Sequence, residues 1–159
     1  MQQYIDWFKS ILRKPDKYAH LKRFSLLKDL NSFELYLLNN HLHTRNYKAG
    51  EVLFEPGYPL EAIYLIEKGE IEIIGPSHPS GHSILKKNQF LGLMDMFHEN
   101  IRSSKATALC DVQVLAVSQA DLKELIDKNP RMGVKILLAV CSSFSNYIFH
   151  LANPGDSKQ

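Results

Sequence analysis

The middle of the chain, from residue 45 to about residue 118, contains a series of short β-rich runs separated by turn residues. The runs follow one another at intervals of roughly 8–12 residues, a spacing typical of all-β barrels and sandwiches. A parallel sheet of βαβ units would instead place helical segments of about 10–15 residues between the strands. The spacing therefore predicts a barrel or sandwich. The runs are 52–54, 62–66, 71–74, 84–85 and 112–117.

Turn-forming residues separate these runs. Lys68-Gly69 lies between two of them and predicts a hairpin turn. Residues 75–81 contain two glycines and two prolines, which predicts a loop. We therefore expect residues 45–118 to form a β-roll of short strands joined by turns and loops.

Apolar residues at helical spacing characterise the N-terminal segment, residues 1–44. Pro15 interrupts the pattern, because proline removes a helical hydrogen bond. Asn31 and Glu34 have the spacing of a capping box and predict the start of a second helix. We expect this segment to pack on the roll or on a partner subunit, with an anionic membrane surface as the alternative. Its basic side chains are Lys9, Arg13, Lys14, Lys17, Lys22 and Arg23.

Helical patterns return after the last β-rich run. Ser118 and Asp121 resemble a helix cap. Asn129 is expected to cap a long final helix that opens at Pro130 and reaches about residue 152. Residues 119–152 therefore form C-terminal helices, and residues 153–159 a polar tail. The whole chain is expected to be one domain of α+β class, mainly β.

Composition limits the functional classes. The 159 residues are 45% hydrophobic and 23% charged, which is typical of a globular domain. A net charge of +2 is too small to indicate nucleic-acid binding. Asp6 and Lys9 interrupt the apolar N-terminus, so we expect no signal peptide. We also expect no membrane span, because the chain lacks a run of about 18 apolar residues.

The two cysteines and seven histidines give little support for catalysis or metal binding. Cys110 and Cys141 lie in apolar surroundings without an adjacent base, so we expect buried structural thiols in a reduced cytoplasm. His41 and His43 stand at the end of a predicted helix, where a spacing of two does not face one way. His78 and His82 lie in a loop rich in proline and glycine and lack a third ligand, so we expect no metal site.

Several spaced residues resemble the first half of the cyclic-nucleotide-binding family. They are the segment 47–54 (YKAGEVLF), Gly57, the segment 63–66 (IYLI) and Gly69. The resemblance covers roughly residues 24–150. It implies a jelly-roll β-roll, also called a double-stranded β-helix, with N-terminal helices and a long C-terminal helix. It also implies a regulatory protein and not an enzyme.

The second half of that resemblance concerns the phosphate-binding cassette. The family pattern is a phenylalanine, a Gly-Glu-Leu, a short helix, and an arginine followed by small residues. Here the segment 90–94 (FLGLM) matches the first part, and the segment 102–104 (RSS) matches the second part. The resemblance implies that the arginine neutralises a cyclic phosphate with its forked donors. The predicted ligand-binding residues are Gly92, Leu93, Met94, Asp95, Arg102, Ser103 and Ser104.

Two positions depart from the family pattern. Leu93 replaces the glutamate that binds the ribose hydroxyl, and losing that bond should weaken binding roughly 10–100-fold. Asp95 would repel a phosphate or pair with Arg102, although it is also interpreted as a stabilising first-turn acid. Asp95 or Glu99 is an alternative partner for the ribose. Outside the family context, Arg102 would be interpreted as a surface arginine.

The final helix carries the most regular apolar pattern in the chain. Its spacings of 3, 4, 3, 4 and 3 form an a/d seam typical of helix pairs. In this family the equivalent helix can form a dimer, so we expect a homodimer; a helix packed wholly on its own domain is the alternative. The seam residues are Val134, Leu137, Cys141, Phe144, Ile148 and Leu151.

Two functional classes remain open from the sequence. The first is a sensor that binds cAMP, cGMP or another small phosphorylated ligand, without further cofactors, and signals through its dimer helix. The second is a non-binding pseudo-sensor that acts as a dimeric protein-interaction module. No segment for DNA reading follows the final helix before Gln159, so either output requires an effector protein or the chain is a fragment. Met1 and the polar tail favour a complete protein.

Overall fold

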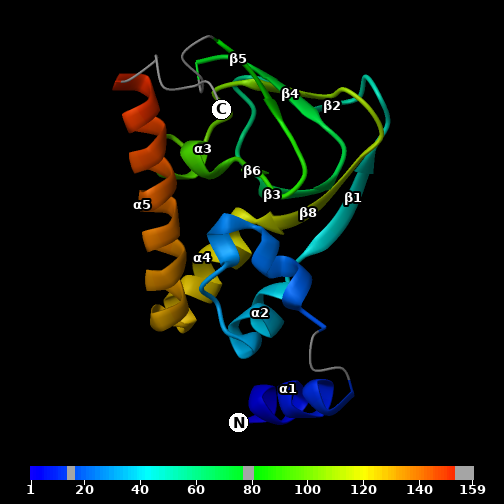
Figure 1. Ribbon diagram of the computed structural model, residues 1–159, viewed down its shortest axis with the longest axis vertical. Coiled ribbons are helices and arrows are strands. Elements are labelled where there is room, and N and C mark those ends of the chain that lie inside the picture. The colour runs from blue at the N-terminus through cyan, green and yellow to red at the C-terminus, as the bar shows by residue number, and fades with distance from the viewer. Residues whose placement is uncertain (14–16, 77–80, 153–159) are drawn as a thin grey trace.

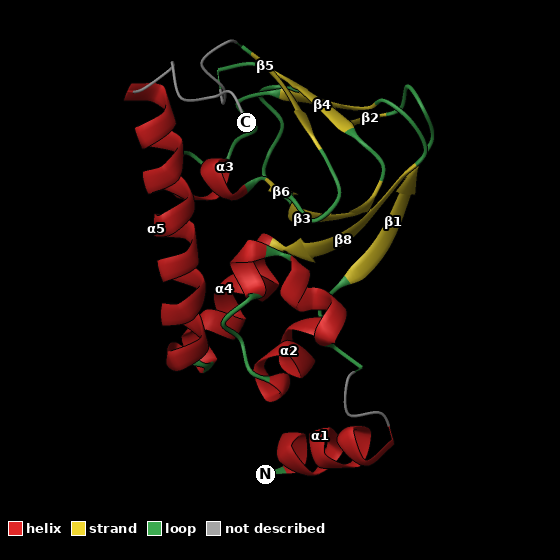
Figure 2. Cartoon of the chain, in the orientation of Figure 1, coloured by secondary structure: helices red, strands yellow, loops and turns green. Residues whose placement is uncertain are grey.

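The computed structural model describes residues 1–13, 17–76 and 81–152. Pro15, His78 and the tail predicted at 153–159 lie outside the described residues. In the described part, two four-stranded antiparallel sheets form the β-roll (Figure 2). The first sheet has the strand order β1 (His43–Tyr47), β8 (Val112–Ser118), β3 (Ala62–Lys68) and β6 (Phe90–Leu91). The second has the order β2 (Val52–Phe54), β7 (Lys105–Ala108), β4 (Ile71–Ile74) and β5 (His82–Leu85).

The central strands β3 and β8 are buried on both faces. In β3, Ile63 and Leu65 face a core shared with the helices, whereas Tyr64 and Ile66 face the interior of the roll. Successive side chains of a strand point to opposite faces, so covering both faces requires a continuous apolar run. This explains the segment 62–66 (AIYLI), in which every residue is buried. The predicted α+β jelly-roll architecture, with N-terminal helices and a long C-terminal helix, is confirmed. The expectation that it is mainly β is wrong, because more of the described residues lie in helices than in strands.

The turn after β3 forms where the sequence predicts it. Gly69 has a φ of +90°, and a Cβ at this position would lie 2.7 Å from the carbonyl oxygen of Asp111. Glycine is the residue that tolerates both the left-handed backbone and this close approach.

The N-terminal helices are α1 (Gln2–Arg13), η1 (Ala19–Arg23), η2 (Ser25–Leu27) and α2 (Ser32–Asn39); α3 (Leu93–Phe97), α4 (Gln119–Lys128) and α5 (Pro130–Ala152) follow. Helices other than α1 share a core with the outer face of the first sheet, and α1 lies beyond α2 (Figure 1). The predicted capping box of α2 is present, since Asn31 Oδ1 accepts from the N–H of Glu34 and Glu34 Oε2 accepts from the N–H of Asn31. Ser118 caps α4 as predicted, with its hydroxyl oxygen accepting from the N–H of Asp121.

The long helix α5 runs beside the roll and past α3 (Figure 1). Its inner face buries Met132, Ile136 and Val140 in the core that the helices share with β3 and β8. Lys135 adds an ion pair with Glu34 of α2, at 2.7 Å between Nζ and Oε2. The helix is therefore held to both the core and the N-terminal helices.

Helix α1 docks on α2 through aromatic side chains. The rings of Tyr4 and Phe33 stack with centroids 4.3 Å apart, and Trp7 meets Phe33 edge-on at 5.4 Å. Phe8 remains 59% exposed. The described contacts of the N-terminal helix are thus with α2 of its own domain, whereas the sequence predicted the roll or a partner subunit.

Some local predictions are wrong. His43 lies in strand β1, because α2 ends at Asn39 and the chain turns into the first sheet. Helix α5 does open at Pro130 after Asn129 as predicted, and the Asn129 carbonyl accepts from the N–H of Gly133. The side-chain amide of Asn129 also donates to the Leu125 carbonyl of α4, so this residue secures the end of that helix as well. Cys110 and Cys141 are exposed. Cys110 lies between β7 and β8, and Cys141 lies on the outer side of α5, so neither reaches a core.

By length and composition, α5 is apolar enough to cross a membrane, with a mean hydropathy of 1.4 over Pro130–Phe149 and 22% of that stretch buried. The sequence predicts no membrane span because it lacks a continuous apolar run. The mean hydropathy over the whole of this helix is nevertheless high enough for one. In the structure α5 packs along the folded domain, so we treat its exposed apolar residues as a packing surface.

Candidate functional site

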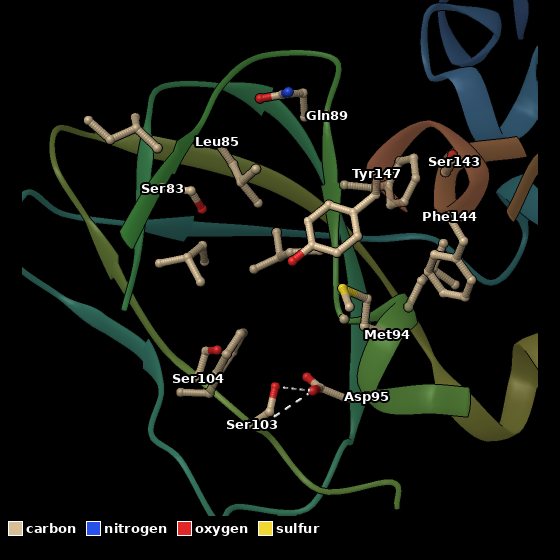
Figure 3. Close-up of a pocket in the computed structure, with 17 residues that line it drawn as sticks. Ser83, Leu85, Gln89, Met94, Asp95, Ser103, Ser104, Ser143, Phe144 and Tyr147 are labelled. Carbon is tan, nitrogen blue, oxygen red and sulfur yellow. Dashed lines mark hydrogen bonds between the residues drawn. The ribbon is translucent and has the colours of Figure 1, made fainter. Parts of the chain in front are cut away.

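A cavity of about 400 Å³ opens between the β-roll and α5. Its wall combines strands β4 and β5, the segment around α3, and one face of α5 (Figure 3). We call it the roll cavity. Its lining residues are Phe54, Ile73, Ser83, Ile84, Leu85, Gln89, Phe90, Leu91, Gly92, Leu93, Met94, Asp95, Ser103, Ser104, Ser143, Phe144 and Tyr147.

Asp95 and Ser103 point toward each other at one end of the roll cavity (Figure 3). Asp95 Oδ1 accepts two hydrogen bonds from this one residue, from the hydroxyl at 2.7 Å and from the backbone N–H at 3.1 Å. Asp95 is only 8% exposed. The pair joins α3 to the strand-like segment that enters β7, and it fixes the carboxylate at the cavity wall.

Arg102 lies behind this pair in the interior of the roll and does not line the cavity. Its side chain is 2% exposed, so it is not the surface arginine of the alternative interpretation. Nη2 donates to the Ala62 carbonyl at 2.6 Å, and Nη1 lies 3.6 Å from Asp95 Oδ2. The guanidinium carbon also stands 3.9 Å from the centroid of the Phe54 ring, which is cation–π geometry.

Burial lowers the pKa of Arg102 from its usual value, while the neighbouring Tyr64 and Asp95 oppose that shift. Nε and Nη1 of Arg102 are buried and have no hydrogen-bond acceptor among the described residues. Buried polar groups are normally satisfied, so such donors indicate a place where an acceptor would be stabilised.

Gly92 separates the guanidinium from the cavity. Its φ is +100°, and a Cβ added there would lie 2.7 Å from Arg102 Nη1. Only glycine combines the left-handed backbone with this approach. The sequence singled out Gly92 as a cassette residue, and the structure adds the reason.

The two residues after Gly92 have different surroundings. Leu93 is 3% exposed and belongs to the core shared by the helices and the first sheet, although it also touches the cavity. Met94 is 42% exposed and stands at the cavity wall. The family's glutamate position is thus filled by a core leucine. Glu99, the alternative ribose partner, is exposed and is absent from the cavity lining.

The structure brings six of the seven predicted ligand-binding residues to the roll cavity: Gly92, Leu93, Met94, Asp95, Ser103 and Ser104. It also places Ser143, Phe144 and Tyr147 of α5 there, which the sequence did not predict. The spacing of three and four between these residues puts them on one helix face, but that pattern alone cannot tell a cavity wall from a core.

The predicted dimer seam divides into two groups. Val134, Leu137 and Ile148 are 55%, 39% and 63% exposed, and Leu151 and Cys141 are exposed as well. Phe144 differs: it is partly buried, lines the roll cavity and meets Phe97 of α3 edge-on at 6.4 Å. Phe144 therefore packs on its own domain, because its helix face turns inward. Five of the six seam residues are thus exposed, and both the homodimer and the alternative of a helix packed wholly on its own domain stay predictions.

The expectation of no metal site stays a prediction. Within residues 1–13, 17–76 and 81–152, no group of three or more histidine, cysteine, aspartate or glutamate side chains could hold a metal ion. His82 pairs with Glu72 at 2.9 Å on the outer side of the second sheet.

A β-roll with a short helix beside a cavity, closed on one side by a C-terminal helix, places the chain in the class of helix-flanked jelly-roll β-rolls. The family described as "Cyclic nucleotide-binding domain" matches residues 44–129, more than half of the chain. The chain belongs to this family.

Relatives of this chain include proteins of several kinds. A protein of Rhodopseudomonas palustris, named as a candidate potassium channel protein, is 27% identical over 133 residues, which cover 81% of this chain and 32% of the relative. The cAMP-dependent protein kinase regulatory subunit of Aspergillus fumigatus is 27% identical over 108 residues, covering 68% of this chain and 26% of the relative. The chain thus spans a quarter to a third of the length of these relatives.

Solved structures share the fold. The catabolite activator protein of Thermus thermophilus superposes with a TM-score of 0.66 at 23% identity, over 80% of this chain and 62% of that one. At this identity the likeness concerns the fold alone.

Proposed function

We propose that the chain is a non-catalytic regulatory module that binds cAMP, cGMP or another small phosphorylated ligand in the roll cavity. The observation that carries the proposal is the composition of the cavity wall. Asp95, Ser103 and Ser104 line it from the roll side, and Phe144 and Tyr147 line it from α5. A ligand seated there would contact both the roll and the helix, and so would favour one position of α5 over another.

Cavity size and buried donors support a small anionic ligand. Cavities for drug-sized molecules typically measure about 300–1,000 Å³, and this one measures about 400 Å³. Arg102 has two buried donors without acceptors directly behind Gly92 and Asp95. A guanidinium binds phosphate oxygens with its forked donors. Relatives named for cAMP dependence make cAMP the first ligand to test.

We further propose that α5 forms a homodimer and passes the binding signal to an effector protein. Its outer face leaves Val134, Leu137 and Ile148 exposed, and apolar a/d positions are normally buried against a second helix. Since the inner face of the same helix touches the cavity, ligand binding and the dimer contact would be coupled through one rigid element. A cytoplasmic location and the absence of further cofactors remain predictions.

Isothermal titration with cAMP and cGMP, using AMP for comparison, tests the ligand proposal. We expect micromolar dissociation constants for a cyclic nucleotide. Arg102→Lys should weaken binding about 10-fold, because lysine keeps the charge but loses the planar fork. Arg23→Lys, at an exposed position of η1, is the matched control and should leave binding unchanged. Absence of binding at millimolar nucleotide would overturn the proposal.

A second candidate function is the non-binding interaction module. It is favoured by Leu93, which is buried where the family has a ribose-binding glutamate. A chain that dimerises in sedimentation but shows no heat and no thermal shift with any of the three nucleotides would fit this candidate. A bound ligand at 100 times its Kd should instead stabilise the fold by about 2.7 kcal/mol.

A further inference from the structure

We propose that the carboxylate of Asp95 is a built-in anion that occupies the phosphate position of the roll cavity and determines how strongly phosphorylated ligands bind. The proposal rests on the proposed function, because it assumes that a phosphate would use the donors of Ser103 and Arg102. Asp95 would then be a specificity-determining residue, and a phosphate must displace its carboxylate to bind.

The hydrogen bonds of Asp95 carry the first step of the argument. Oδ1 accepts from both the hydroxyl and the backbone N–H of Ser103, at 2.7 and 3.1 Å. A convergent hydroxyl and amide pair of this kind is a normal receptor for one oxygen of a phosphate. In the described structure both donors are already satisfied by one carboxylate oxygen.

The second carboxylate oxygen faces the arginine. Oδ2 lies 3.6 Å from Nη1 of Arg102, and that guanidinium is 2% exposed. The distance is too long for a hydrogen bond, and Nη1 has no acceptor in the described residues. Asp95 therefore balances the buried charge of Arg102 but leaves Nη1 of Arg102 without a hydrogen bond. A carboxylate whose two oxygens face these two donor groups copies the contacts expected of a phosphate.

A purely local role does not explain this placement. An acid in the first turn of a helix normally interacts with the N–H groups of that turn. The carboxylate of Asp95 instead bonds Ser103, eight positions further along the chain and outside α3. Glu99 has the same charge and follows α3, but it is exposed and lies outside the cavity lining. Glu99 is therefore a matched control for the charge of Asp95.

The test is the Kd of cAMP for the whole chain and five variants, measured by isothermal titration. We expect Asp95→Ala to bind cAMP about 10–100-fold more tightly than the wild type, the equivalent of one charge-assisted hydrogen bond regained. Asp95→Asn, which keeps the shape and removes the charge, should bind more tightly by a smaller factor. Glu99→Gln should leave the Kd within about 2-fold.

The Ser103→Ala substitution tests whether Asp95 acts by occupying the hydroxyl of Ser103 or only through its negative charge. In the wild type its hydroxyl is held by Asp95, so Ser103→Ala should change the Kd little. In the Asp95→Ala background the hydroxyl is released to the ligand, so adding Ser103→Ala should reverse most of the gain. Equal effects of Ser103→Ala in the two backgrounds would contradict the proposal.

The outcomes distinguish this inference from the proposed function. If the wild type binds cAMP and neither Asp95 variant binds more tightly, the inference is wrong and the proposed function stands. If the wild type does not bind but Asp95→Ala does, the inference stands and the natural chain is not a cyclic-nucleotide sensor. If nothing binds, both are wrong. Should Asp95→Ala fail to fold, as judged by circular dichroism, Asp95→Asn decides in the same way.

Discussion

A Cβ placed on Gly92 would lie 2.7 Å from Nη1 of Arg102 and 3.3 Å from the carbonyl oxygen of Ala62, which accepts the hydrogen bond from Nη2. The guanidinium, its acceptor and the backbone before α3 are thus in contact at one point. A side chain at position 92 therefore requires the guanidinium to shift from its present place. The glycine is a structural requirement of the buried arginine.

Gly92→Ala should therefore destabilise the domain more than an ordinary left-handed glycine substitution. We expect a loss of about 1–2 kcal/mol for the left-handed backbone and about 1–3 kcal/mol for the displaced guanidinium. Gly57→Ala is the matched control, because Gly57 has a φ of +84° but nothing within 4 Å of an added Cβ. Urea unfolding of both variants measures the difference. Equal losses would show that the arginine adapts freely.

Ile148→Glu should convert the proposed homodimer into a monomer. Ile148 is 63% exposed on the outer face of α5, and a charge buried in an apolar helix contact is strongly unfavourable. Asn146→Glu, two positions earlier and on nearly the opposite side of the helix, is the matched control and should remain dimeric. Sedimentation equilibrium measures both. A wild-type chain that sediments as a monomer would contradict the dimer.

A substitution at Phe144 would not test the dimer, because this side chain packs on its own domain. The a/d spacing places Phe144 in the seam with Ile148, yet its ring meets Phe97 of α3 and lines the cavity. A helix with two apolar faces has no single period, so spacing cannot assign each residue to a face. The three-dimensional course of α5 beside the roll is needed for that.

Much of the fold could be predicted because its local signals agree with one another. The strands at 62–68 and 112–118, the Gly69 turn and the capping box at Asn31 each have a short-range physical cause. Strands β1, β6 and β7 were not predicted, because β1 (HTRNY) is polar and mostly exposed, β6 has two residues, and β7 (KATA) is weakly apolar. Their pairing partners, not their own residues, hold them in the sheets.

The candidate site was predicted less completely than the fold. The resemblance located Gly92, Arg102 and Ser103, and the structure shows that Arg102 lies behind the cavity wall. The Asp95–Ser103 bonds depend on α3 and the segment before β7 meeting in space. A pairing across eight residues of irregular chain leaves no periodic signal in the sequence. The sequence predicts that Asp95 repels a phosphate or pairs with Arg102, but its bonds to Ser103, on which the proposed role depends, come from the structure.

The ion pair between α5 and α2 gives a further stability prediction. Lys135 Nζ lies 2.7 Å from Glu34 Oε2, and the same carboxylate closes the Asn31 capping box. Glu34→Gln keeps an acceptor for the cap and removes the charge. We expect a loss of about 1–2 kcal/mol in urea unfolding, reduced from the value for a fully buried pair because Lys135 is partly exposed.

Lys128→Met supplies the comparison for Glu34→Gln. Lys128 pairs with Glu124 one turn earlier on α4, and both side chains are exposed. Exposed pairs of this kind contribute about 0.3–0.5 kcal/mol, so this variant should unfold close to the wild type. A loss equal to that of Glu34→Gln would show that burial of the Glu34 carboxylate adds nothing.

Tyr147 links the roll cavity to α5 most directly. Figure 3 shows its side chain entering the cavity from the helix, opposite the Asp95–Ser103 pair. Tyr147→Ala should weaken cyclic-nucleotide binding about 10-fold, since losing aromatic contact on a ligand removes about 1–2 kcal/mol. Asn146→Ala, the adjacent exposed position, should bind like the wild type. If Tyr147→Ala binds as well as the wild type, the ligand does not touch α5, and the proposed route from cavity to dimer helix is wrong.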